Sequence, residues 1–193
     1  APHLEGLGLD ERATKVYSRL IHASGDVGYA PITRMHPEAI DCAIAALKSG
    51  AHIYTDVEMV RTGINKKKLA SFGGEVHCLV ADPDVAVRAK ELGITRAMVA
   101  MRQFGKALNG SIVAIGNAPT ALFEVLRLVR EEGIRPACIV GIPVGFVGAA
   151  ESKAALASHG IVPYITVEGT KGGSPIAAAA INALMYLIDN TRP

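Results

Sequence analysis

Residues 168–175 combine glycines with a basic and a hydroxyl side chain, a composition that can bind an anion. Lys171, Gly172, Gly173 and Ser174 lie between a short β-branched run and an apolar helical pattern. Glycines let backbone N–H groups approach a ligand closely, and a helix N-terminus favours negative charge, so the loop could hold a phosphate or a carboxylate. A tight strand-to-helix turn has the same composition. The spacing is not that of a nucleotide-binding P-loop, because the lysine precedes the glycine pair.

Residues 116–120 form a second loop of this kind, with Asn117 and Thr120 on either side of Pro119. Asn117 and free backbone N–H groups could face a ligand cleft. Pro119 by itself favours an efficient helix start, which would explain the loop without a ligand. Both interpretations fit the sequence.

A third loop, residues 142–148, places Phe146 and Val147 between Gly145 and Gly148. Apolar side chains beside glycines suit a wall against a large flat ligand. A buried crossover between two elements would have the same composition, so the loop alone does not name a ligand.

Two further side chains could perform or assist proton transfer and anion binding. His22 lies near the end of an amphipathic pattern, and imidazole with its unperturbed pKa of about 6.5 suits proton transfer at neutral pH. Arg96 follows Gly93 at a predicted helix start and could present a guanidinium fork to a carboxylate. A structural or solvated side chain is the alternative for each. No pair of histidines has the i, i+4 metal spacing with a third ligand nearby, so we expect no metal bound by the protein.

Apolar periodicity predicts the elements that position these residues. Strands are expected at 52–56, 76–81, 111–116, 137–142 and 162–167, and helices at 10–24, 37–49, 57–62, 84–92, 96–108, 119–132, 150–158 and 175–189. The strand runs are nearly continuous in apolar character, which is typical of a parallel sheet covered on both faces. Alternating strands and helices predict an α/β three-layer sandwich with five parallel strands in an order such as 2-1-3-4-5. Such sheets bind ligands at the carboxyl ends of their strands, where the loops described above lie.

Composition limits the protein class. The 193 residues predict one domain, 1–193, and a net charge of +2 lacks the basic footprint of a nucleic-acid partner. Cys42, Cys78 and Cys138 form neither a disulfide framework nor a zinc spacing, which favours a reducing compartment. The longest apolar stretches fall short of the ~20 residues of a membrane span, and no signal peptide opens the sequence. We expect a soluble, cytoplasmic domain without a membrane partner.

Three segments, residues 111–123, 141–153 and 171–175, together resemble the precorrin-8X methylmutases of cobalamin biosynthesis. The resemblance runs from about residue 10 to residue 189. Further stretches look more like the anaerobic, cobalt-first branch of that family: residues 53–56, 62–66 and 71–75.

The resemblance implies an isomerase that moves a methyl group from C-11 to C-12 of cobalt-precorrin-8 to give cobyrinic acid. The alternative is the metal-free precorrin-8X enzyme, which gives hydrogenobyrinic acid. The resemblance also implies a flavodoxin-like fold and no added cofactor, since any cobalt belongs to the substrate. It further implies a homodimer that holds a tetrapyrrole polycarboxylate near the subunit boundary. A non-catalytic corrinoid carrier would use the same loops, whereas a nucleotide-using enzyme would need phosphate motifs that the sequence lacks.

Site residues carry over by motif. The family's catalytic histidine, in an Arg-x-hydrophobic-His motif late in the first helix, matches His22 after Arg19, and its substrate-contacting arginine matches Arg96. Ala97 stands where the family usually has serine, and residues 1–6 do not match the upstream segment that carries a substrate-binding serine, which is either missing here or replaced in its role. The expected substrate-binding set is Arg19, Arg96, Asn117, Thr120, Gly145, Phe146, Val147, Lys171, Gly172, Gly173 and Ser174.

Overall fold

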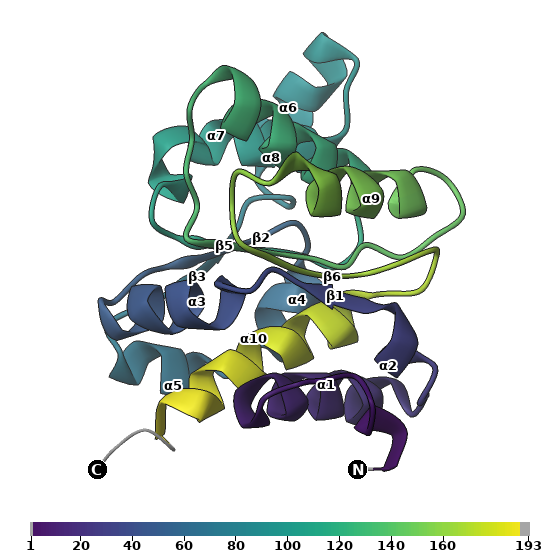
Figure 1. Ribbon diagram of the computed structural model, residues 1–193. Coiled ribbons are helices and arrows are strands. Elements are labelled where there is room, and N and C mark those ends of the chain that lie inside the picture. The colour runs from purple at the N-terminus through teal and green to yellow at the C-terminus, as the bar shows by residue number, and fades with distance from the viewer. Residues whose placement is uncertain (1, 190–193) are drawn as a thin grey trace.

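The computed structural model describes residues 2–189 and has three layers, with one sheet between two layers of helices (Figure 1). The strands are β1 (Thr33–Met35), β2 (Ile53–Thr55), β3 (Val76–Cys78), β4 (Ile112–Ile115), β5 (Cys138–Gly141) and β6 (Tyr164–Val167). The layer drawn above the sheet in Figure 1 contains α6 (Pro83–Leu92), α7 (Arg96–Phe104), α8 (Pro119–Glu131) and α9 (Ala149–His159). The lower layer contains α1 (Glu11–Ser24), α2 (Tyr29–Ile32), α3 (Ala39–Lys48), α4 (Glu58–Gly63), α5 (Lys66–Ser71) and α10 (Ser174–Asp189).

The sheet has six strands in the order β1-β6-β5-β4-β2-β3. All five expected strands are present and pair in parallel, whereas β1 pairs antiparallel with β6 at the edge. The expectation of a five-stranded, purely parallel sheet is therefore wrong, and the strand order differs from the expected one by this additional edge strand. The carboxyl ends of the parallel strands share one edge, and the loops that follow them begin there.

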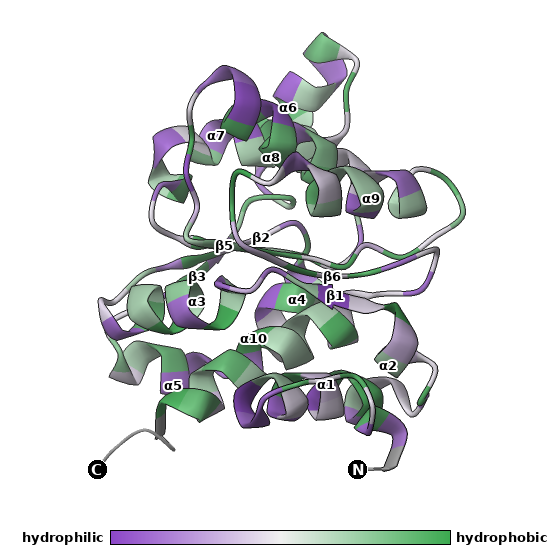
Figure 2. Cartoon of the chain, in the orientation of Figure 1, coloured by the Kyte–Doolittle hydropathy of each residue, from purple (hydrophilic) through white to green (hydrophobic). Residues whose placement is uncertain are grey.

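Each face of the sheet packs against its own apolar core. In β4, Ile112 and Ala114 belong to the cluster formed with the lower helices, whereas Val113 and Ile115 belong to the cluster formed with the upper ones. Burial on both faces explains why the central strands read as continuous apolar runs. Figure 2 shows the hydrophobic colouring concentrated along the sheet and on the inward sides of the helices.

Several helix boundaries differ from those expected. The helix expected at 96–108 ends at Phe104, because Gly105 has a positive φ of 48° and the chain continues as a 3-10 turn. Two short helices, α2 and α5, were not predicted as elements, and the lysines of 66–68 form the first turn of α5. At the first helix, Asp10 caps α1 by accepting a hydrogen bond from the Ala13 amide at 2.7 Å. Within residues 2–189, every helix is too short or too polar to cross a bilayer.

Candidate active site

His22 and Arg19 lie together in a groove of about 420 Å³ between α1 and α10. Their i, i+3 spacing places both side chains on one face of α1. The Arg19 guanidinium lies 5.5 Å from the centroid of the Tyr186 ring of α10, a cation–π contact that orients it along the groove. His22 is exposed and in the last turn of its helix. The groove is lined by Thr14, Lys15, Ser18, Arg19, His22, Ala183, Tyr186 and Leu187.

A second hollow, of about 390 Å³, begins at the end of the same helix and contains Lys171 and Gly172. The Lys171 ammonium pairs with the Asp26 carboxylate at 2.5 Å and lies 5.7 Å from the Tyr29 ring centroid. The hydrogen bond with Asp26 raises the pKa of Lys171, and the same bond lowers the pKa of Asp26. Lys171 thus carries a charge that is already partly compensated, and it meets a ligand as one half of an ion pair.

The glycine pair of this loop is explained by the backbone, through a close approach at Gly172 and a positive φ of 126° at Gly173. A Cβ at Gly172 would lie 2.5 Å from the carbonyl oxygen of Ile142 in the loop after β5. Gly173 donates its amide hydrogen to the same carbonyl at 2.9 Å, and Ser174, at the start of α10, is only 6% exposed. The tight-turn interpretation therefore accounts for both glycines. A role for the loop in anion binding stays a prediction.

Lys153 of α9 holds the same loop from the other side of the sheet. Its side chain is 1% exposed, and its ammonium donates a hydrogen bond of 2.5 Å to the Lys171 carbonyl oxygen. Burial lowers the pKa of Lys153 to about 8. Lys153 ends one of the segments that carry the family resemblance, but its role cannot be predicted from sequence, because its partner is a backbone atom on a distant loop.

Asp56, directly after β2, is a second residue without a role in the sequence analysis. Its buried carboxylate accepts hydrogen bonds from the amides of Gly116, Asn117 and Ala118 at 3.0, 2.9 and 2.7 Å. Burial raises the pKa of Asp56, and the three N–H bonds act in the opposite direction. Of the two interpretations of this loop, the one with free N–H groups facing a ligand therefore does not hold for these three amides, because Asp56 binds them. The Asn117 side chain itself is exposed.

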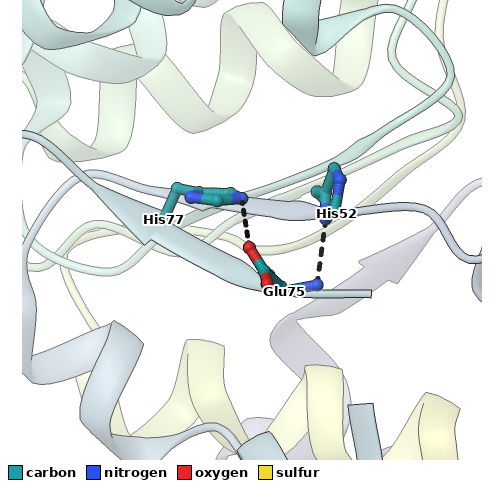
Figure 3. A group of neighbouring side chains, drawn as sticks. All are labelled: His52, Glu75 and His77. Atoms are coloured by element: carbon teal, nitrogen blue, oxygen red, sulfur yellow. Dashed lines mark hydrogen bonds and ion pairs between the residues drawn. The ribbon is translucent and has the colours of Figure 1, made fainter. Parts of the chain in front are cut away.

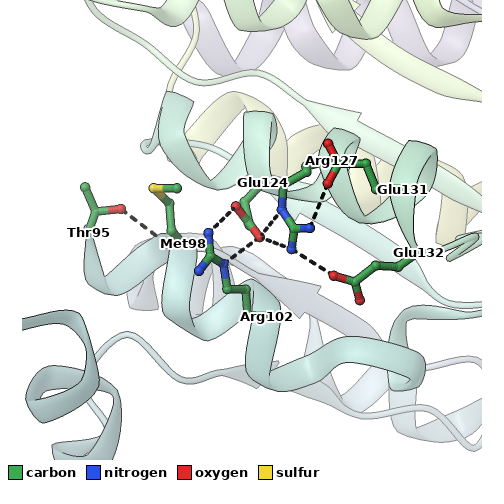
Figure 4. Close-up of polar contacts among 7 residues, drawn as sticks. All are labelled: Thr95, Met98, Arg102, Glu124, Arg127, Glu131 and Glu132. Carbon is green, nitrogen blue, oxygen red and sulfur yellow. Dashed lines mark hydrogen bonds and ion pairs between the residues drawn. The ribbon is translucent and has the colours of Figure 1, made fainter. Parts of the chain in front are cut away.

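Arg96 and Thr120 lie on the upper layer of helices, at the N-termini of α7 and α8. The Thr95 hydroxyl caps α7 by accepting from the Met98 amide at 3.2 Å (Figure 4). The same hydroxyl contacts the Thr120 hydroxyl at 2.9 Å. The two helix starts are thereby joined. Arg96 is exposed, and among residues 2–189 no side chain pairs with its guanidinium. Neither Arg96 nor Thr120 lines the groove that contains His22, which lies on the lower layer.

Glu124 of α8 links the same two helices more than one turn beyond their N-termini. Its carboxylate is 2% exposed and receives hydrogen bonds from Arg102 of α7 at 2.7 Å and from Arg127 of α8 at 2.7 Å (Figure 4). Burial acts to raise the pKa of Glu124, but the two guanidinium groups outweigh it, so the pKa lies below its ordinary value. This ion network fixes the helix pair that presents Arg96 and Thr120.

The loop after β5 carries the most exposed apolar side chains of the described chain. Phe146 is 93% exposed and Val147 is 89% exposed, while Gly145 donates its amide hydrogen to the Thr170 carbonyl of the loop after β6 at 3.1 Å. The neighbouring Val144 lines the hollow that contains Lys171. An apolar surface next to a polar hollow is the arrangement expected for a large ligand with an apolar body and charged edges.

Comparison with known proteins decides the family. A family model described as precorrin-8X methylmutase matches residues 3–187. The chain belongs to the precorrin-8X methylmutase family. A member from Leptospira interrogans, named cobalt-precorrin-8 methylmutase, is 46% identical over 90% of this chain and 82% of its own. One from Sinorhizobium, named precorrin-8X methylmutase, is 47% identical over 86% of this chain and 79% of its own. The crystal structure of a Thermus thermophilus precorrin-8X methylmutase covers 95% of this chain and 89% of its own, at 38% identity and a TM-score of 0.87.

Proposed function

We propose that this protein moves a methyl group from C-11 to C-12 of cobalt-precorrin-8 to give cobyrinic acid in cobalamin biosynthesis, with His22 as proton donor and acceptor. Membership of the methylmutase family supports the reaction class. The observation that carries the site is the groove between α1 and α10, which holds His22 beside Arg19 and adjoins the hollow of Lys171.

The reaction needs an electron-poor ring and one fixed geometry. In the proposed step, protonated His22 donates its proton, or a strong hydrogen bond, to the macrocycle near the reacting carbons. The bond from C-11 to the methyl carbon then breaks as the bond to C-12 forms, and the proton returns to the imidazole. Substrate and product are isomers, so no oxidant, reductant or second substrate is consumed. Acid assistance of this kind contributes about 10²–10⁴-fold to a rate.

The substrate carries many carboxylates, while the chain has a net charge of only +2. We assign the carboxylates to local donors: the guanidinium groups of Arg19 and Arg96, the Lys171 ammonium, and the N-termini of α7 and α10, where the helix dipole favours negative charge. Phe146 and Val147 would cover the apolar face of the macrocycle. The other residues proposed to contact substrate are Asn117, Thr120, Gly145, Gly172, Gly173 and Ser174.

We further propose a cytoplasmic homodimer with the substrate near the subunit boundary. The groove beside His22 opens along the outer surface of α1 and α10, where a second chain could close it. The cobalt form of the substrate is supported by the resemblance of residues 53–56, 62–66 and 71–75 to the anaerobic branch. The name of the Leptospira relative agrees with it. The metal-free substrate is the alternative, in keeping with the name of the Sinorhizobium relative.

The test is an anaerobic incubation with cobalt-precorrin-8, followed by absorbance and mass together. The parent protein is expected to change the spectrum at unchanged mass. His22→Ala should bind the substrate but lose turnover by about 10²–10⁴-fold. His36→Ala, which removes a histidine that contacts Tyr164 at the amino-terminal end of β6, should behave as the parent. A spectrum that reverts to that of unaltered substrate on denaturing release would mean a carrier. Undiminished turnover by His22→Ala would remove His22 from the mechanism, and faster turnover of precorrin-8X would assign the metal-free substrate.

A further inference from the structure

Three possible metal ligands meet at the N-terminal ends of β2 and β3, at the opposite edge of the sheet from the proposed active site. Tyr54 is paired with His77 across these parallel strands, so His52 lies opposite Glu75. Because side chains alternate along a strand, Glu75 and His77 point to the same face, and His52 joins them there. That face is the upper one, since the His77 ring stacks on Tyr54 with centroids 5.2 Å apart.

The three side chains converge (Figure 3). Their potential ligand atoms all lie within 4.8 Å of one another, with His77 Nε2 and Glu75 Oε2 3.8 Å apart. Ligands bonded at about 2.0–2.1 Å to a tetrahedral zinc ion are roughly 3.3 Å apart. The remaining distance is within reach of a side-chain rotation, because the Glu75 side chain is 74% exposed and free to move toward the imidazoles.

We infer that His52, Glu75 and His77 form a binding site for Zn²⁺ or a similar divalent transition metal ion. Two imidazoles and one carboxylate are a donor set that zinc accepts, with water in the fourth position. Helical i, i+4 spacing of histidines does not indicate this cluster. Its ligands combine an i, i+2 pair, Glu75 and His77, with His52 beside the neighbouring strand.

One existing interaction limits the affinity. The Glu75 amide donates a hydrogen bond of 3.0 Å to Nδ1 of His52, so that lone pair is already in use. A metal ion bound through Nδ1 displaces this bond, and the site is open to solvent. The site is therefore weaker than a closed structural zinc site made of four protein ligands.

Metal bound here would tie β2 to β3, the outermost pair at this side of the sheet. A ligand that binds the folded state alone raises its stability by mass action. The site shares no residue with the proposed methylmutase site, so metal binding and methyl transfer are separable.

The test is calorimetric titration of the tag-free, metal-stripped protein with Zn²⁺, with a parallel Co²⁺ titration followed by visible absorption. One ion is expected per chain, together with a rise in melting temperature. His77→Phe keeps an aromatic ring against Tyr54 and Glu75→Gln keeps the side-chain volume. Each should weaken binding at least ~10-fold, since loss of a ligand costs no less than loss of the hydrogen bond that orients one. His22→Ala, which removes a histidine elsewhere, should bind as the parent.

Two results would overturn the inference. Absence of saturable binding by the parent in excess Zn²⁺ would mean that the three side chains do not form a site. Equal affinity of His77→Phe, Glu75→Gln and the parent would place the ion elsewhere. A thiolate-to-cobalt charge-transfer band would do the same, because it identifies a cysteine ligand.

Discussion

Replacing Glu124 by glutamine should destabilise the helix pair α7 and α8 strongly, because it removes the charge of a carboxylate that is only 2% exposed. The carboxylate accepts four N–H bonds, two from Arg102 at 2.7 and 3.2 Å and two from Arg127 at 2.9 and 2.7 Å. Glutamine keeps the volume but has one oxygen, and its amide hydrogens face the two guanidinium groups. Removing one partner of a fully buried ion pair costs about 3–5 kcal/mol.

The arginines moderate that value. Their side chains are 38% and 29% exposed, so each guanidinium can recover water when its partner is lost. We therefore expect Glu124→Gln to lower the free energy of unfolding by about 2–3 kcal/mol. For a domain of this size, such a loss corresponds to a fall in Tm of roughly 5–10 °C.

The loss should depend on pH in a defined direction. The folded pKa of Glu124 lies below its ordinary value of 4.5, so its stabilisation is complete above pH 4.5 and disappears as the pH falls through the folded pKa. The difference in unfolding free energy between parent and variant should therefore be largest at neutral pH and narrow on acidification. Urea unfolding followed by far-UV circular dichroism measures it, since the chain has no tryptophan to report by fluorescence.

Glu131→Gln is the matched control. Glu131 pairs with the same Arg127 at 3.1 Å, but its side chain is 62% exposed, so its loss should cost less than ~0.5 kcal/mol. Equal losses for the two variants would refute the argument that burial of the Glu124 carboxylate sets the magnitude. A Glu124→Gln loss that stays constant between neutral and acidic pH would refute the role of its charge.

Two further predictions concern the loop after β6. Gly172→Ala should lower the free energy of unfolding by about 1–3 kcal/mol in urea, because its Cβ would lie 2.5 Å from the Ile142 carbonyl oxygen. An unfolding free energy equal to that of the parent would contradict this. The unfolding free energy of the parent should rise by up to about 3 kcal/mol between pH 8 and pH 10.5, because the folded Lys153 loses its proton before the unfolded one does. Lys153→Met should lack this rise, and an equal rise in the variant would assign it to other groups.

Most of the parallel core could be predicted from sequence, because β2, β4, β5 and β6 are short and almost entirely buried runs next to a turn signal. β1 could not. Its three residues, Thr33–Met35, are one buried, one exposed and one half-buried, so neither an alternating nor a continuous pattern is visible. Its identity as a strand comes from pairing with β6, which lies near the other end of the sequence.

The site shows the same division. His22 and Arg19 were found because a motif on one helix carries both. Asp56 and Lys153 could not be predicted, because each binds backbone atoms of a distant loop. Every residue has the same backbone atoms, so a sequence does not indicate which of them accept or donate such bonds. In the sequence, Glu124 looks like an ordinary charged residue on the surface of a helix. Only the packing of α7 against α8 shows that it is buried.

The antiparallel pairing of β1 with β6 has a consequence for how the protein folds during its synthesis. As the chain leaves the ribosome, α1 and β1 appear long before their partners α10 and β6. Residues 11–35 must wait, exposing apolar surface, while β2 to β5 emerge and pair. Once α10 packs against α1, it forms the second wall of the groove beside His22. A nascent chain interrupted before α10 would hold all six described strands but only the α1 side of that groove, so the complete groove would exist only in molecules whose synthesis has passed that point.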